Sequence, residues 1–356
     1  MPHEVVLLPG DGIGPEVTAA ARRVVEATGV AVDWLVYDVG VTAVQKGHEP
    51  LPVGVLESVR STGVALKGPV STPRGAGGFP SVNLALRREL GLHAQVRPCR
   101  LRPGVPSHLR SVDLLVVRDT TEDLYAGIEV GRDEPLAADL RDLLARHGRS
   151  LPERAGVAVK FVTEAAVDRV VRLAFDLART RPARSVTAVH KATVMPTTDG
   201  LFLDTARGVA SDYPDIEFRD ESIDAMCARL VRDASAYDVL VMGYQYGDIV
   251  SDVAGALVGG IGLIPGVNLG PGVAVFEAAH GTAPHRAEQD VANPVAMVLC
   301  AAMLLRHLGE VGAADGVEQA VDAVLAAGKV RTYDLVGTAP AVGTAAMTEA
   351  VVAALP

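Results

Sequence analysis

Short aliphatic runs alternate along this chain with segments whose apolar residues recur at helical spacing, and this alternation limits the possible folds most strongly. Runs typical of buried strands are Val5–Leu8, Trp34–Tyr37, Val64–Lys67, Leu114–Val117 and Val239–Met242. Helical spacing is found in Glu16–Ala27, Val82–Leu90, Glu164–Thr180, Pro294–Leu308 and Val317–Ala327. The pattern predicts the α/β class, with helices covering a sheet.

The composition fits that class, since 49% of the residues are hydrophobic but only 4% are aromatic, so aliphatic side chains must fill the core. With 356 residues the chain is long enough for two lobes or for one large α/β unit. The Pro- and Arg-rich segment Arg97–Pro106 predicts a crossing between lobes or an exposed loop.

Charge and hydropathy exclude several kinds of partner. A net charge of −10 argues against nucleic-acid binding, which requires basic surface. The longest apolar stretch, Val253–Val267, is glycine-rich and shorter than the roughly 20 residues of a membrane span. No secretory signal is visible, and the three cysteines form no CxxC pair. We therefore expect a cytoplasmic protein that binds neither nucleic acid nor membrane.

A row of arginines is the first candidate for chemistry. Arg87 follows Ser81 and Asn83 on one predicted helix, and Arg97 and Arg118 come later in the chain. Converging guanidinium groups bind carboxylates in a bidentate manner and would hold a polyanion. The alternative, which applies to any single arginine, is an ion pair at the surface.

Two aspartates form the second candidate. In a helix, Asp248 and Asp252 would lie one turn apart, and two carboxylates so placed suit Mg²⁺ or Mn²⁺. The alternative, favoured by spacing alone, is a helix cap with an acid in the first turn.

Lys191 and Tyr125 form a potential acid–base pair, because a lysine near a metal and arginines would have a lowered pKa. The alternative is an ordinary surface lysine and a partly buried tyrosine. No GxGxxG motif follows a strand, so the fingerprint of a Rossmann fold is absent.

Together these segments resemble the isocitrate and isopropylmalate dehydrogenase family of β-decarboxylating dehydrogenases. The similarity is carried, in order, by the motifs Leu8–Glu16, Gly247–Asp252, Phe276–Pro284 and Asn293-Pro294. It implies a two-lobed isopropylmalate dehydrogenase-like α/β fold that is not a Rossmann fold. Residues 1–98 and 252–356 would form a large cofactor-binding domain from both chain ends. Residues 99–251 would form a smaller central domain with substrate, metal and interface residues.

The resemblance also implies roles for individual residues in a homodimer whose active sites are shared. Arg87, Arg97 and Arg118 match arginines that bind the substrate carboxylates. Asp248 and Asp252 match metal ligands, and Asp224 matches a ligand that the partner subunit donates. Lys191 matches a lysine, also from the partner subunit, that helps to take the hydroxyl proton. Tyr125 matches the acid that protonates the enolate after carbon dioxide leaves.

Ser81 and Asn83 resemble the isocitrate branch, where polar side chains meet a third carboxylate or another polar group. The expected reaction is therefore NAD(P)-dependent oxidative decarboxylation of an isocitrate-like 2-hydroxy tricarboxylic acid, with Mg²⁺ or Mn²⁺. The alternatives are the same chemistry on homoisocitrate or on a phosphonate or other analogue in a specialised biosynthetic pathway. An alternative of another class is a non-catalytic partner subunit of a hetero-oligomer.

The chain departs from the family pattern at Thr193, Thr120 and Tyr244, where asparagine is usual. These departures are the reason for keeping the alternative substrates open.

The cofactor site implied by the resemblance comprises His280, Gly281, Thr282, Ala283, His285, Arg286, Asn293 and Tyr333. His285 and Arg286 stand where NAD-using relatives have an acid for the ribose diol, and their positive character suits a 2′-phosphate. Tyr333 fits an NADP pattern as well, whereas Gly337, where some NADP enzymes have arginine, does not. The prediction is NAD or NADP, with a preference for NADP.

Overall fold

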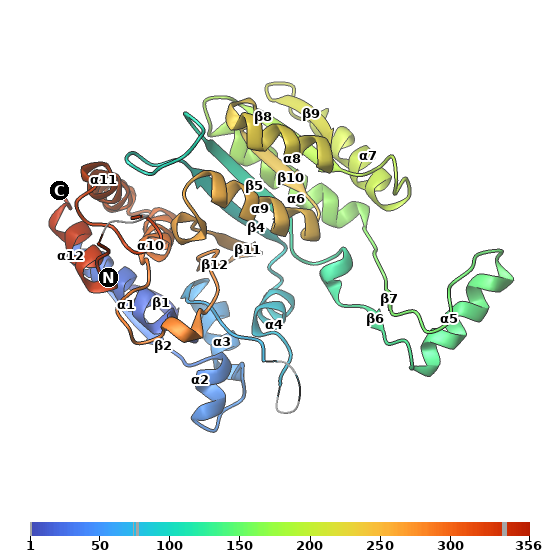
Figure 1. The fold of residues 1–356 in the computed structure, drawn as a ribbon, viewed down its shortest axis with the longest axis horizontal. Helices are drawn as coiled ribbons and strands as arrows, with labels where there is room; N and C mark the ends of the chain where they lie inside the picture. The colour runs from blue at the N-terminus through green and yellow to red at the C-terminus, as the bar shows by residue number, and fades with distance from the viewer. Residues whose placement is uncertain (1, 74, 76–77, 337–339) are drawn as a thin grey trace.

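A ten-stranded sheet runs through the molecule in the order β2-β1-β3-β12-β11-β4-β5-β10-β8-β9 (Figure 1). The computed structural model describes residues 2–73, 75, 78–336 and 340–356. The strands of this sheet are β1 (His3–Leu8), β2 (Val32–Val36), β3 (Val64–Lys67), β4 (Ala94–Arg100), β5 (Asp113–Asp119), β8 (Ser185–His190), β9 (Glu217–Ser222), β10 (Val239–Met242), β11 (Val267–Gly270) and β12 (Val273–Glu277). A separate two-stranded sheet pairs β6 (Glu129–Val130) with β7 (Val157–Ala158).

Helices cover both faces of the large sheet, which confirms the predicted α/β class. They are α1 (Gly14–Ala27), α2 (Gly40–Gln45), α3 (Val53–Thr62), α4 (Val82–Glu89), α5 (Pro135–Arg146), α6 (Glu164–Arg179), α7 (Thr198–Ala210), α8 (Ile223–Arg232), α9 (Tyr244–Leu257), α10 (Val295–His307), α11 (Val311–Ala327) and α12 (Thr344–Ala353). Short 3₁₀ turns are η1 (Leu124–Ala126), η2 (Ala234–Ala236), η3 (Ile261–Leu263) and η4 (Pro284–Arg286). Among the described helices, none is both long and apolar enough to cross a membrane.

The sheet consists of two parallel halves that point in opposite directions. Strands β2, β1, β3 and β12 are parallel to one another, and so are β5, β10, β8 and β9. Between the halves, β11 is antiparallel to β12 and to β4, and β4 is antiparallel to β5. The centre of the molecule is therefore the place where the two halves meet.

The alternative of an exposed loop at Arg97–Pro106 is wrong for its first four residues, which belong to β4, and the alternative of a crossing stays a prediction. Arg97 and Cys99 are buried, because β4 crosses the middle of the sheet. Because Arg97 and Pro98 interrupt its apolar residues, β4 does not form the continuous apolar run that predicts a strand.

The predicted division into two domains stays a prediction. The boundary at 98/99 falls inside β4 and the boundary at 251/252 falls inside α9. The segments assigned to the large domain supply β1, β2, β3, β11 and β12, and the central segment supplies β5, β8, β9 and β10.

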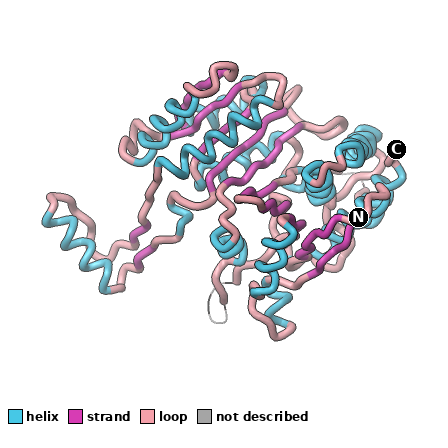
Figure 2. The backbone as a smooth tube through the Cα atoms, turned by 180° about the vertical axis from the view of Figure 1, so that it is seen from behind, coloured by secondary structure: helices cyan, strands magenta, loops and turns pink. Residues whose placement is uncertain are grey.

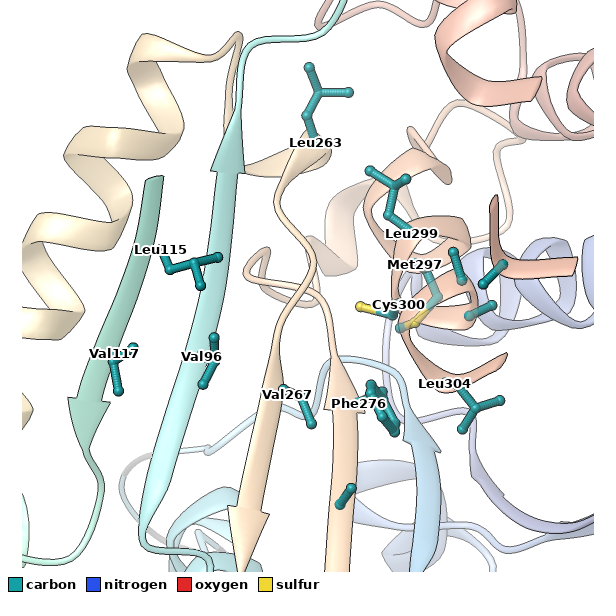
Figure 3. Close-up of a cluster of buried hydrophobic side chains, with 14 of the residues drawn as sticks. Val96, Leu115, Val117, Leu263, Val267, Phe276, Met297, Leu299, Cys300 and Leu304 are labelled. Carbon is teal, nitrogen blue, oxygen red and sulfur yellow. The ribbon is translucent and has the colours of Figure 1, made fainter. Parts of the chain in front are cut away.

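One face of the sheet carries an apolar core that extends across both halves. Val96, Val117 and Phe276 belong to it from β4, β5 and β12, and Met297 and Leu304 of α10 lie on the side of Phe276 (Figure 3). Further helices, α1, α6, α7, α11 and α12, contribute buried residues to the same cluster. Cys300 also lies in this core, and burial raises the pKa of its thiol to about 12, as expected for an inert free cysteine.

The opposite face is split by a row of polar side chains. On one side of the row lies an apolar cluster that includes Leu8, Val59 and Leu86, and on the other side lies a cluster that includes Leu240 and Val250. The row takes one buried residue from each of β3, β12, β11, β4 and β5, which are Lys67, Glu277, Asn268, Gln95 and Arg118. The strand register places all five on the same face.

Glu277 is the centre of this row. Its Oε2 pairs with Lys67 Nζ at 2.6 Å, and its Oε1 accepts from Gln95 Nε2 at 3.0 Å and Asn268 Nδ2 at 2.8 Å. Arg87 Nη2 on α4 also reaches Oε1, at 3.1 Å. Burial alone would raise the pKa of Glu277, but Lys67 and Arg87 outweigh it and hold the pKa well below its usual range.

Strands β6 and β7 and helix α5 form an arm, defined as residues 128–159, that stands away from the rest of the molecule (Figures 1 and 2). The arm exposes Ile128, Leu136, Leu143 and Val159. A two-stranded sheet with one helix buries little apolar surface and is marginally stable by itself.

We expect Glu277→Gln to lower the free energy of unfolding by about 3–5 kcal/mol, because an amide would leave Lys67 and Arg87 buried without a counter-charge. Urea unfolding followed by circular dichroism measures this loss.

The matched control is Glu349→Gln, which removes an exposed carboxylate paired with Arg23 and should cost no more than about 1 kcal/mol. Equal, small losses for both variants would show that the buried charges have little influence on stability.

Candidate active site

The three predicted arginines lie around the first turns of α9. Arg118 Nη1 pairs with Asp248 Oδ1 at 2.8 Å, and Arg97 Nη1 lies 3.4 Å from Asp252 Oδ1. The guanidinium carbons of Arg87 and Arg118 lie 5.6 Å and 5.1 Å from the ring centroid of Tyr244. Arg97 and Arg118 are buried, so the alternative of surface arginines is wrong for both.

The close approach of these cations lowers the pKa of one of them. Burial, followed by the charge of Arg97, lowers the pKa of Arg118 to about 10. Among the described residues, the buried Nε of Arg97 has no hydrogen-bond partner. A cluster of buried guanidinium groups with unused donors is suited to an anionic ligand.

Asp248 and Asp252 lie one turn apart on α9, as predicted. The alternative of a helix cap is wrong, because the N-cap is Gly243 and Asp248 is the fifth residue of the helix. Burial, together with the charge of Asp248, raises the pKa of Asp252. The pair supplies hard oxygen donors at the edge of the arginine cluster.

Gly247 allows α9 to lie directly on the Arg118 side chain. A Cβ at position 247 would come within 2.3 Å of Arg118 Cβ, closer than any real contact. Glycine is thus required at position 247, because α9 lies so close to β5 that no side chain fits between them.

Lys191 and Asp224 form a second, separate group. Lys191 follows β8, Asp224 lies in the first turn of α8, and the two side chains form an ion pair with each other. This contact holds the pKa of Asp224 below its usual value. Among the described residues, no three histidine, cysteine or acidic side chains gather as a metal site. One chain therefore brings together two of the three predicted ligands.

The backbone near Lys191 is held by a buried acid. Asp199 Oδ2 accepts from the Lys191 backbone nitrogen at 2.7 Å, and its Oδ1 pairs with Lys160 Nζ at 2.6 Å. Thr193, two residues further on, is exposed.

Tyr125 lies beside the arginine cluster on η1. Its ring meets the ring of Tyr244 edge to face, with centroids 5.0 Å apart, and its side chain remains 36% exposed. Burial, followed by the charge of Asp248, raises the pKa of Tyr125, so the phenol holds its proton at neutral pH.

Ser81 and Asn83 lie at the start of α4, on the helix that carries Arg87. Ser81 is the N-cap and its Oγ accepts from Leu84 N at 3.4 Å. Within the described residues, the buried Oδ1 of Asn83 has no hydrogen-bond partner. An unpaired buried amide is costly unless a ligand satisfies it.

A cavity of about 280 Å³ lies between η3, η4 and the segment around Tyr333. Most of the predicted cofactor residues line it, and these are His280, Gly281, Ala283, Arg286, Asn293 and Tyr333. Thr282 lines a neighbouring cavity of about 720 Å³, which Gly281 shares.

Several side chains in this region are suited to contacts with a nucleotide. Arg286 Cζ stacks 3.8 Å from the Tyr333 ring centroid, and its Nε donates to His285 Nε2 at 3.2 Å. Burial lowers the pKa of His280, whose buried Nε2 has no partner among the described residues. Gly337, the residue that argued against NADP, lies outside the described residues.

Thr120 has a structural task at this site. Its hydroxyl donates to the Leu92 backbone oxygen at 2.8 Å, and its neighbour Asp119 accepts from the backbone nitrogens of Thr121 and Glu122. Both residues therefore stabilise the turn after β5.

Four further residues, which the sequence did not predict as part of the site, surround Arg87 and Arg118, and these are Lys67, Gln95, Asn268 and Glu277. Arg118 Nε donates to Gln95 Oε1 at 2.8 Å, and Arg87 Nε donates to Asn268 Oδ1 at 3.1 Å. One signal was present, since Lys67 and Glu277 each end a strongly apolar run. The roles predicted for the individual site residues stay predictions.

The fold and this site define an α/β protein with a cluster of guanidinium groups beside paired carboxylates, an arrangement suited to a polyanion. The family model of isocitrate/isopropylmalate dehydrogenase matches residues 4–351. The chain is 41% identical over 336 residues to the alpha chain of a probable mitochondrial isocitrate dehydrogenase (NAD) of Caenorhabditis elegans, covering 94% of this chain and 88% of that one. It is 40% identical to a mitochondrial regulatory chain of isocitrate dehydrogenase (NAD) of Dictyostelium discoideum, covering 94% and 88%.

Among solved structures, the isocitrate dehydrogenase of Methylococcus capsulatus superposes with a TM-score of 0.90 at 43% identity, and the match covers 99% of both chains. The chain belongs to the isocitrate/isopropylmalate dehydrogenase family, whose members are metal-dependent decarboxylating dehydrogenases. The predicted isopropylmalate dehydrogenase-like fold is thereby confirmed.

Proposed function

We propose that this protein oxidises and decarboxylates an isocitrate-like 2-hydroxy tricarboxylic acid to a 2-oxo acid and carbon dioxide, with NAD or NADP as hydride acceptor. The observation that carries the proposal is the placement of Arg87, Arg97 and Arg118 against the acidic pair Asp248 and Asp252. The names of the relatives, which are NAD-dependent isocitrate dehydrogenases, support it.

The charges at the site favour a trianionic substrate. The arginines and Lys67 supply four positive charges, and the carboxylates of Glu277, Asp248 and Asp252 supply three negative ones. A divalent cation adds two more positive charges, so a tricarboxylate would neutralise the whole cluster. A dicarboxylate would leave an excess cation in a partly buried site, which is unfavourable.

Asp248 and Asp252 are suited to hold Mg²⁺ or Mn²⁺, since both present carboxylate oxygens from one helix face and remain partly exposed. When bound, the metal lowers the pKa of the substrate hydroxyl and stabilises negative charge on oxygen, and the nicotinamide accepts hydride.

The side chains of this protein would do the remaining work. The three arginines bind and orient the carboxylates, and Asn83 offers its unpaired amide to the third acid group. Lys191 takes the hydroxyl proton at the start of the reaction. Tyr125, protonated at neutral pH, donates a proton to carbon after carbon dioxide has left.

A second copy of this chain would complete the site. Lys191 and Asp224 pair with each other and do not contact Asp248 or Asp252 in the described chain, so we place them in the active site of the partner subunit. The arm supports a homodimer, because its exposed Ile128, Leu136 and Leu143 need a covering surface. We expect the protein to be located in the cytoplasm.

The test is reduction of NAD and NADP by the purified chain with Mg²⁺ across isocitrate, homoisocitrate, isopropylmalate, malate, tartrate and a phosphonate analogue of isocitrate. We expect turnover of isocitrate and its loss in Lys191→Ala. Turnover of homoisocitrate or the phosphonate alone would move the function to a specialised pathway. No reduction of either dinucleotide with any of the six acids would favour the remaining alternative, a non-catalytic subunit of a hetero-oligomer.

Complementation tests whether active sites are shared. Lys191→Ala and Asp252→Asn should each be inactive alone. Co-expressed in equal amounts, the two variants should recover about a quarter of the activity of the unsubstituted protein. Half of the randomly paired dimers are mixed, and in each mixed dimer one of the two active sites has both Lys191 and Asp252 intact. Activity no higher than that of the separate variants would show that each chain uses its own Lys191.

The cofactor proposed is NADP, although the relatives named above are NAD enzymes by name. Arg286, stacked on Tyr333 beside His285, supplies positive charge for a 2′-phosphate. Arg286→Ala should lower kcat/KM for NADP about tenfold or more and leave kcat/KM for NAD nearly unchanged.

Arg22→Ala, which removes an exposed arginine paired with Glu26 on α1, is the control and should change neither value. A preference of the unchanged protein for NAD, or an equal effect of Arg286→Ala on both cofactors, would contradict the NADP proposal.

A further inference from the structure

Tyr244 occupies the middle of the arginine cluster. It is the first residue of α9 and is 2% exposed. Its ring lies 5.1 Å from Arg118 Cζ and 5.6 Å from Arg87 Cζ, measured to the ring centroid. Its other neighbour is the Tyr125 ring, at 5.0 Å and an interplanar angle of 66°. The ring thus fills the space that separates two substrate-binding arginines from the proposed proton donor.

The phenol oxygen of Tyr244 also holds Arg87. Arg87 Nη1 donates to this oxygen, while Nε and Nη2 of Arg87 are bound to Asn268 and Glu277. The guanidinium is therefore fixed from three sides, and its remaining N–H groups face a limited set of directions. Because the phenol oxygen accepts from Arg87, its own O–H is left to donate to an anionic group beside the arginine.

We infer that Tyr244 is a specificity-determining residue, which limits the length of the acid that fits between Arg87 and Arg118. The inference rests on the proposed function and deepens it. The preferred substrate is a compact tricarboxylic 2-hydroxy acid, and the Tyr244 ring excludes homologues with a longer side arm. The aromatic ring is packed between two fixed cations and cannot move aside easily. An added methylene in the substrate would therefore clash with the ring.

The experiment compares Tyr244→Phe with Tyr244→Asn on isocitrate and homoisocitrate. Tyr244→Phe keeps the ring and loses the contact with Arg87. It should raise KM for both acids by about tenfold, since a hydrogen bond to a charged group is lost, and leave kcat and the ratio between the acids nearly unchanged. Tyr244→Asn removes the ring and with it the steric clash. It should raise the kcat/KM of homoisocitrate relative to isocitrate by about 10–200-fold, the usual range of discrimination between substrates that differ by one methylene.

A purely structural role for Tyr244 predicts another outcome. Both variants would then weaken the two acids in equal proportion, and this result would overturn the inference. Should Tyr244→Asn fail to fold, Tyr244→Leu removes the ring with a smaller change in polarity and carries the same expectation.

Calorimetric binding of the two acids, with Mg²⁺ and without dinucleotide, separates this inference from the proposed function. An altered ratio of binding constants in Tyr244→Asn supports the inference even if the unchanged protein turns over neither acid. Active protein with an unaltered ratio in turnover and binding leaves the proposed function intact and overturns the inference.

Discussion

The buried ion pairs of Glu277 are the interaction on which the rest of the structure depends. Lys67 and Arg87 are held out of water, where each ion loses several kcal/mol of hydration unless a partner restores it. Glu277 is that partner, and Gln95 and Asn268 satisfy its remaining lone pairs. Without this carboxylate Lys67 and Arg87 would be buried at the centre of the sheet face with no counter-charge from Glu277.

Local pattern was sufficient for the elements whose buried face is apolar. Val64–Lys67 is a strand as predicted, and the predicted helix Glu164–Thr180 differs from α6 by a single residue. Strand β4 was not predicted, because Gln95 and Arg97 are buried in it at positions where an isolated strand would place aliphatic residues. Propensity cannot show that polar and charged side chains from other strands and from α9 make such burial favourable.

The site was predictable to the extent that its residues carry formal charge in motifs. Arg87, Arg97, Arg118, Asp248 and Asp252 were named from the sequence, and the structure brings them together. Lys67, Asn268 and Glu277 were not predicted as site residues, since their proximity to Arg87 follows from strand order and register, neither of which appears in a local stretch of sequence.

The polar row has a consequence for how the sheet finds its alignment. Its five side chains share one face only in the native register, and a slip of one residue in β4 would turn Gln95 and Arg97 into the apolar core on the other side. Such a sheet would bury a guanidinium among aliphatic side chains without a counter-ion. The polar row, which includes Arg118 of the candidate active site, therefore disfavours misaligned pairings of the central strands.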